Sequence, residues 1–172
     1  MTVDFGEPPR DRRDANLIGF GVCATLMAYA LYAQHVLGYE PCPLCILQRV
    51  AVIALGALYL LAWLHAPRPR GARIYAVLLG LTALIGALVA WRHLWIIAQP
   101  PGTVAECGAS LDYMLDVLPL REVLAKVLSG SGECAKVDWR FLGLTMPAWV
   151  LTCLAALGAL GVWGNASRRA RR

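Results

Sequence analysis

Cys42 and Cys45 lie three residues apart, where a long apolar run begins. Pro43 suits the first turn of a helix, because its φ is fixed and it lacks an N–H, and it pushes Cys42 toward extended backbone. We expect Cys42 just outside the helix and Cys45 in its first turn, where backbone N–H groups and the helix dipole favour a thiolate. Arg49 follows Cys45 by four residues and shares its helix face. A dithiol with one stabilised thiolate beside a cation is typical of a redox site.

The composition indicates a membrane protein. Hydrophobic residues make up 59% of the 172 residues, whereas soluble domains average about 45–50%. The net charge of +5 comes largely from arginines that gather at the borders of the apolar runs, within 10–13, 68–73 and 168–172. This is the pattern of the positive-inside rule. It excludes nucleic-acid binding, which needs basic residues on one folded face.

The apolar runs predict an all-α membrane protein of one domain. A membrane-spanning helix needs about 20 apolar residues, and four segments meet this requirement, at about 17–34, 44–64, 74–91 and 141–163. The arginine clusters then place both termini on the cytoplasmic side and loops 35–43 and 94–140 on the outer side. An alternative is that Ala28-Tyr29-Ala30 marks the cleavage site of a signal peptide. Cleavage would leave three spans and put the closing arginines on the wrong side.

The long outer loop contains an amphipathic stretch. Apolar residues recur at helical spacing from Leu111 to Leu128, interrupted by Pro119, and charged residues occupy the opposite face. The stretch forms either a small core helix or a helix lying on the membrane surface. We favour the membrane surface, because so short a loop offers little else to pack against. The Ser129–Gly132 segment is expected to be a flexible hinge before Cys134.

Two polar residues near the predicted outer edge have alternative interpretations. Arg49 lies inside the second span, where a charge is costly, so it either serves the dithiol or extends to the lipid headgroups. His93 follows the third span in a basic and aromatic belt, so it either anchors the chain at the interface or serves the same dithiol.

The predicted topology sorts the six cysteines into two groups. Cys23 and Cys153 fall within spans, where lone cysteines behave as small hydrophobic residues. The other four lie on the outer, oxidising side: Cys42, Cys45, Cys107 and Cys134. Four cysteines allow three connectivities, of which adjacency favours Cys42–Cys45 and Cys107–Cys134.

Three interpretations of these four cysteines compete. Structural disulfides would make the protein a four-span membrane scaffold, but they explain a Cys-x-x-Cys pair at a membrane edge poorly. A Cys₄ zinc site would require two short-spaced pairs, so we expect no metal. A relay of thiol–disulfide exchanges uses all four sulfurs and needs an acceptor of two electrons at the membrane. A lipid-soluble quinone fits that location, and Arg49 would donate hydrogen bonds to a quinone oxygen.

The chain resembles the disulfide bond formation protein B (DsbB) family of bacterial inner-membrane thiol oxidases over nearly all of its length. The resemblance rests on Cys42-Pro-Leu-Cys45 followed by Arg49, on the later pair Cys107 and Cys134, and on Phe141–Trp149, which opens the last span. The short-spaced pair comes first here, whereas vitamin-K-epoxide-reductase-like proteins place their loop pair before it.

The resemblance implies a four-transmembrane-helix bundle with a short amphipathic helix in the second periplasmic loop. It also implies a monomer in the bacterial inner membrane that reoxidises a periplasmic thioredoxin-fold oxidase of the DsbA type. The partner's thiol would form a mixed disulfide with Cys107, and Cys134 would then attack Cys42. Cys45 would donate electrons to ubiquinone or menaquinone, with Arg49 stabilising the quinone and His93 nearby. Gln48 departs from the pattern, because some members have an acidic residue there, and we expect it to tune the site.

Overall fold

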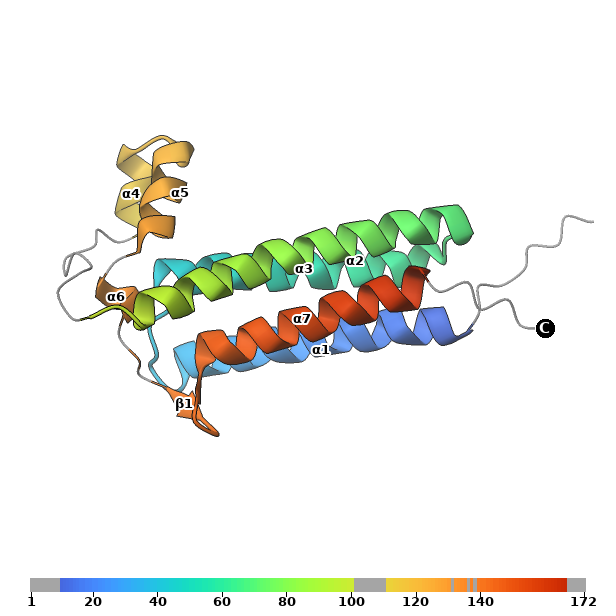
Figure 1. Ribbon diagram of the computed structural model, residues 1–172, viewed down its shortest axis with the longest axis horizontal. Helices are drawn as coiled ribbons and strands as arrows, with labels where there is room; N and C mark the ends of the chain where they lie inside the picture. Colours follow the sequence, from blue (N-terminus) through green and yellow to red (C-terminus); the bar gives the residue numbers. More distant parts are fainter. Residues whose placement is uncertain (1–9, 101–110, 131, 136, 138, 167–172) are drawn as a thin grey trace, which may run out of the picture.

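The computed structural model describes residues 10–100, 111–130, 132–135, 137 and 139–166. Four long helices form a ring in which each packs against its two neighbours in the order α1, α2, α3 and α7 (Figure 1). Their bounds are α1 Arg10–His35, α2 Pro43–His65, α3 Pro69–Ile97 and α7 Met146–Ala166. Helices α1 and α3 end, and α2 and α7 begin, at one end of the bundle, which we call the cysteine end.

The prediction of an all-α, four-span membrane protein is confirmed. Within the described residues, four helices are long and apolar enough to cross a membrane. Their outward faces carry many exposed large apolar side chains, such as Ile53, Ile85 and Trp163, as expected of surfaces that face lipid rather than water. Helix α1 packs against both α2 and α7, so the segment proposed as an alternative signal peptide is part of the bundle.

Helix α3 extends beyond its predicted span in both directions. The predicted span stopped at residue 91 because Arg92 and His93 are polar, whereas the helix continues to Ile97. His93 and Ile96 are buried, and this packing stabilises the additional turns. At 1.5 Å per residue, the 29-residue helix is about 43 Å long, which exceeds the hydrocarbon core by roughly 13 Å. The helix is therefore long enough for its last turns to extend beyond the hydrocarbon core.

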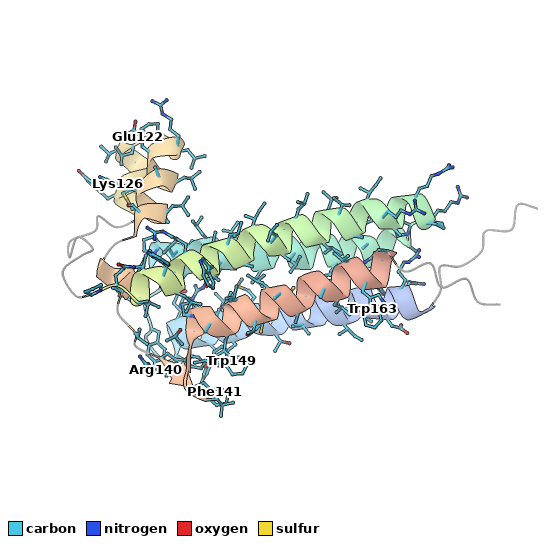
Figure 2. All side chains as sticks on the ribbon, in the orientation of Figure 1. Glu122, Lys126, Arg140, Phe141, Trp149 and Trp163 are labelled. Carbon is cyan, nitrogen blue, oxygen red and sulfur yellow. The ribbon has the colours of Figure 1, made fainter. Side chains whose placement is uncertain are left out.

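The fourth membrane helix begins later than its predicted start at residue 141. Strands β1 (Arg140–Phe141) and β2 (Leu144–Thr145) pair antiparallel ahead of α7. Leu142 and Gly143 turn the chain with positive φ values of 50° and 80°, and this backbone conformation cannot continue into a helix. Phe141 and Trp149 lie together beside β1 in Figure 2, and the Trp149 indole donates a hydrogen bond to the Phe141 carbonyl at 3.1 Å.

The described residues between α3 and β1 form three helices where the sequence predicted one amphipathic helix. They are α4 (Leu111–Val117), α5 (Leu120–Ser129) and α6 (Gly132–Ala135). Pro119 separates α4 from α5, because proline lacks the N–H that a continuous helix would need there. Met114, Val123 and Val127 are buried at the cysteine end, while Val117, Leu120 and other apolar side chains of the α4–α5 hairpin are exposed. The hairpin therefore packs against the bundle through one face only.

Small residues let the membrane helices approach closely. An added Cβ at Gly158 of α7 would lie 2.8 Å from the Ala83 Cβ of α3, and one at Gly86 would lie 2.9 Å from Leu154. Such close approach increases van der Waals contact between helices in lipid. Next to this contact, the buried Tyr59 donates a hydrogen bond to the Leu157 carbonyl.

Gly158→Ala is expected to destabilise the bundle by about 1–3 kcal/mol, the usual cost of overpacking a close-packed core. Its methyl group would overlap the Ala83 methyl group, and two packed helix backbones would have to separate. Gly21→Ala is the matched control, because a Cβ at Gly21 has no atom within 4 Å. Loss of helical circular dichroism in detergent on heating measures both variants, and equal midpoints would contradict the prediction.

Candidate functional site

Cys42 and Cys45 occupy the positions predicted from Pro43. Cys42 is the N-cap of α2 with extended backbone, Pro43 is in the first turn, and the Cys42 Sγ accepts a hydrogen bond from the Cys45 N–H at 3.4 Å. The two sulfur atoms are 3.2 Å apart. This exceeds the roughly 2.05 Å of a disulfide bond, so the two residues are free thiols. Small side-chain rotations would bring the sulfur atoms within bonding distance.

His93 lies beside both sulfur atoms. Its Nε2 is 3.8 Å from the Cys42 Sγ, and its Nδ1 is 4.0 Å from the Cys45 Sγ. The Nε2 atom is also 3.0 Å from the carbonyl oxygen of Cys134, and Nδ1 is 3.2 Å from the Gln48 Nε2. Because a carbonyl oxygen only accepts, Nε2 carries the hydrogen and Nδ1 accepts from Gln48. The structure thus brings His93 next to the dithiol, and its role toward the dithiol or a quinone stays a prediction.

Cys134 also lies at this place. It is 1% exposed and packs in the apolar cluster that contains Cys42, Leu44 and Ile96. Its backbone carbonyl lies 3.0 Å from the His93 Nε2. Cys107 lies outside the described residues, so its pairing with Cys134 stays a prediction. Three of the four cysteines predicted to react are therefore brought together, although they are separated by some ninety positions in the chain.

Arg49 is half-buried one turn below Cys45 and is tied to α1. Its Nη1 donates to the Gln34 Oε1, and its Nη2 donates to the Ala30 carbonyl at 3.2 Å. A guanidinium group has five N–H donors, so donors remain for another acceptor. The side chain is thus anchored to α1, and its role toward the dithiol stays a prediction.

Two cavities meet at Cys45. The inner one, of about 120 Å³, lies between α1, α2 and α7 and contains one cation, Arg49. Its other lining side chains are mostly apolar: Leu26, Met27, Ala30, Ala33, Tyr39, Pro41, Val52, Met146 and Val150, with Glu40, Gln48 and Cys45. The second cavity, of about 80 Å³, opens at the cysteine end and is lined by Cys42, Cys45, His93 and Trp139, among others. Cys42 thus faces only the end cavity, whereas Cys45 faces both.

The inner cavity fits one ring-shaped apolar group. A cavity of about 150 Å³ lined by apolar side chains binds benzene in another protein, and this cavity approaches that size. Arg49 and Gln48 add hydrogen-bond donors at one side of it. A quinone ring, which is apolar with carbonyl oxygens at its edge, matches this lining.

A metal ion fits the same residues less well. The ligand atoms of Cys42, Cys45 and His93 lie within 4.8 Å of one another, a spacing that a metal ion could bridge. Both ring nitrogens of His93 already have hydrogen-bond partners, however, and a metal ion would have to displace one of them. The arrangement is better suited to thiol–disulfide exchange, in which a thiolate attacks a neighbouring sulfur.

The sequence-based reasoning missed several residues of this site. Gln34 and Ala30 hold Arg49 from another helix, and no local pattern links positions that are 15 or more residues apart on different helices. Gln48 was expected to tune the site, and its hydrogen bond to His93 shows which side chain it would act on. A polar side chain three residues after Cys45, inside an apolar helix, is the signal that points to it.

Comparisons with known proteins agree with this site. The family "Disulfide bond formation protein DsbB" matches residues 12–164. Three relatives, each named "Disulfide bond formation protein B", come from Methylococcus capsulatus, Azoarcus sp. and Nitrosococcus oceani. The first is 51% identical over 91% of this chain and 96% of its own length, the second 45% over 95% and 98%, and the third 48% over 85% and 86%. Because the match takes in the whole bundle core and both cysteine-bearing segments, the chain belongs to the DsbB family of membrane proteins of disulfide bond formation.

Proposed function

We propose that this protein is a protein-dithiol:quinone oxidoreductase of the bacterial inner membrane. It reoxidises a periplasmic thioredoxin-fold oxidase of the DsbA type and passes the electrons through two disulfides to ubiquinone or menaquinone. This sustains disulfide bond formation in exported proteins. The observation that supports it most strongly is the position of Cys45, which faces both the end cavity and the apolar cavity with Arg49.

In the proposed relay, the partner's thiolate attacks Cys107 of a Cys107–Cys134 disulfide and releases Cys134 as a thiolate. Cys134 then attacks the Cys42 sulfur of a Cys42–Cys45 disulfide, forms a bond to it and releases Cys45 as a thiolate. The packing of Cys134 with Cys42 in one buried apolar cluster supports this order, because Cys45 is only partly buried against that cluster. Each exchange makes one S–S bond and breaks one.

The residues that would hold the quinone are those of the inner cavity. Arg49, anchored by Gln34, would present a fixed positive charge, and the apolar walls from α1, α2 and α7 would exclude water. The quinone supplies a two-electron acceptor when it is bound. The N–H at the His93 Nε2 donates to the Cys134 carbonyl and also lies near the Cys42 sulfur. From there it can stabilise negative charge on the Cys42 sulfur when Cys42 and Cys45 are reduced.

The location and topology belong to the same proposal. The arginine cluster at 68–73 lies at the end of the bundle opposite the cysteines, the same end at which α1 begins and α7 ends. The positive-inside rule then puts both termini in the cytoplasm and the four reacting cysteines in the periplasm, where disulfides persist.

Quinone reduction by the purified protein in detergent tests the function. With a reduced thioredoxin-fold oxidase as donor, we expect continuous turnover with ubiquinone or menaquinone, followed by ultraviolet absorbance. Folded protein that reduces neither quinone would contradict the proposal and support the alternative, a four-span scaffold with structural disulfides. Retained helical circular dichroism in the same sample is the control for folding.

A further inference from the structure

Arg92 makes contacts that the relay described above does not use. Its Nε donates to the Leu128 carbonyl at 2.9 Å, and its Nη2 donates to the Ser129 carbonyl at 3.2 Å. These carbonyls end α5, where the last turn of a helix lacks intrahelical donors and carries the negative end of the dipole. In the described part of the chain, Arg92 is not among the side chains that line either cavity. It joins the end of α3 to the end of α5.

Gly130 makes a second contact between the same two places. Its φ is +90°, and an added Cβ would lie 2.5 Å from the Cδ1 of Ile96, which is 1% exposed. The backbone at Gly130 therefore passes directly over the Ile96 side chain, in a conformation that side chains other than hydrogen rarely allow. The position of α5 relative to α3 is fixed by close contact as well as by the Arg92 hydrogen bonds.

A third contact of α3 holds the chain that follows α5. The His93 Nε2 donates to the Cys134 carbonyl at 3.0 Å, and α6, which carries Cys134, packs against α3 at the cysteine end (Figure 1). Three neighbouring positions on α3 thus hold this part of the chain. Arg92 binds residues 128–129, Ile96 contacts Gly130, and His93 binds Cys134. Together they determine where the Cys134 sulfur lies.

We propose that Arg92 is a positioning residue that holds Cys134 within reach of Cys42. This inference rests on the proposed relay and specifies its internal step, in which the Cys134 thiolate bonds to Cys42 and Cys45 leaves as a thiolate. The segment before Cys134 has the sequence Ser-Gly-Ser-Gly, which is flexible when nothing holds it. The Arg92 contacts raise the effective concentration of the Cys134 sulfur at Cys42, because they limit the volume that it samples.

The direct test is the rate at which Cys134 and Cys42 form a disulfide. In a Cys45→Ser, Cys107→Ser background, diamide oxidises the two remaining thiols of the site, taking two electrons and two protons. Labelling of free thiols at successive times measures the rate on a gel. We expect Arg92→Gln to slow it about three- to tenfold, because both lost hydrogen bonds are exposed and solvent weakens such charged contacts. Arg92→Lys keeps the charge and one hydrogen bond, so its rate of disulfide formation should lie between those of wild type and Arg92→Gln.

Arg121→Gln is the matched control. Arg121 is an exposed arginine of α5 whose partner is the neighbouring Glu122, so the variant removes the same charge from the hairpin that Arg92 contacts and leaves the Arg92 hydrogen bonds in place. It should leave the rate unchanged. Equal rates in wild type and Arg92→Gln, or equal slowing in Arg92→Gln and Arg121→Gln, would overturn the proposal.

A second variant tests the position by another contact. Gly130→Ala introduces a methyl group against Ile96 and should slow the same disulfide formation at least as much as Arg92→Gln. Gly143→Ala is its control, since Gly143 also has a positive φ but has no atom within 4 Å of an added Cβ. If both glycine variants slow the reaction equally, backbone strain alone explains the effect and the contact with Ile96 is not what positions Cys134.

Turnover separates this inference from the proposed function. A small dithiol that reduces Cys42–Cys45 directly bypasses Cys134, so Arg92→Gln should keep the wild-type rate with that donor. With the protein donor it should lose the same factor of about three to ten. A fall with both donors would overturn the positioning role. Absence of turnover in wild type would contradict the proposed function, and the diamide rates would still decide whether Arg92 places Cys134.

Discussion

Cys45→Ser is expected to abolish quinone reduction with every electron donor. Serine keeps the size and position of the side chain but has no sulfur that can cycle between thiolate and disulfide. Cys45 is also the only one of the described cysteines that faces both cavities, so no described sulfur can replace it beside Arg49. The measurement is quinone absorbance with a protein donor and with a small dithiol.

Two further variants are the controls for the Cys45→Ser result. Cys153→Ser removes a half-buried thiol from the first half of α7 and should keep full turnover, because Cys153 lines neither cavity. Cys107→Ser should lose turnover with the protein donor while the small dithiol still reduces Cys42–Cys45. Appreciable quinone reduction by Cys45→Ser would mean that electrons leave from another sulfur, and the assignment of Cys45 would then be wrong.

The arrangement at the start of α2 could be predicted because its causes are local. Pro43 fixes the first turn, and the helix that follows places Cys45 and Arg49 on one face. The bundle could also be predicted. Each membrane helix makes its backbone hydrogen bonds internally and is recognised in the sequence by its length and apolarity. Both inferences use only residues that are close in the sequence.

The contacts that assemble the site could not be predicted in the same way. Gln48 meets His93 across two helices, and Arg92 meets the end of α5 across 36 positions. These pairings depend on how α2, α3 and α5 are oriented, which follows from packing and not from local pattern. The predicted end of the third span was too early for the same reason, because tertiary burial of His93 and Ile96 outweighs the polarity of that stretch.

The two interpretations of the amphipathic segment prove to be compatible with one structure. Val123 and Val127 pack against the bundle beside Cys134, while Leu120 and Leu124 on the same helix are exposed. A helix of two apolar faces can dock on the protein and touch the membrane interface at once. The docked face matters more for chemistry, because it packs in the same apolar cluster as Cys42 and Cys134.

Arg49→His is expected to raise the apparent KM for quinone by about tenfold or more, with a smaller change in kcat. Arg49 lines the inner cavity, and its guanidinium is oriented by the Gln34 side chain and the Ala30 carbonyl. A hydrogen bond from a charged donor contributes about 1.5–3 kcal/mol, which corresponds to roughly 10- to 100-fold in affinity. The shorter imidazole cannot reach both α1 acceptors and has fewer donors, so bound quinone would lose this contact.

Two controls separate the charge of Arg49 from its orientation. Arg70→His changes an exposed arginine at the opposite end of the bundle and should leave quinone kinetics unchanged. Gln34→Leu keeps the guanidinium charge but removes one of its anchors, so it should raise KM by less than Arg49→His does. Unchanged quinone kinetics in Arg49→His would show that the cavity binds quinone without this residue. An equal rise in Gln34→Leu and Arg49→His would instead mean that the fixed direction of the guanidinium donors, more than its charge, determines quinone affinity.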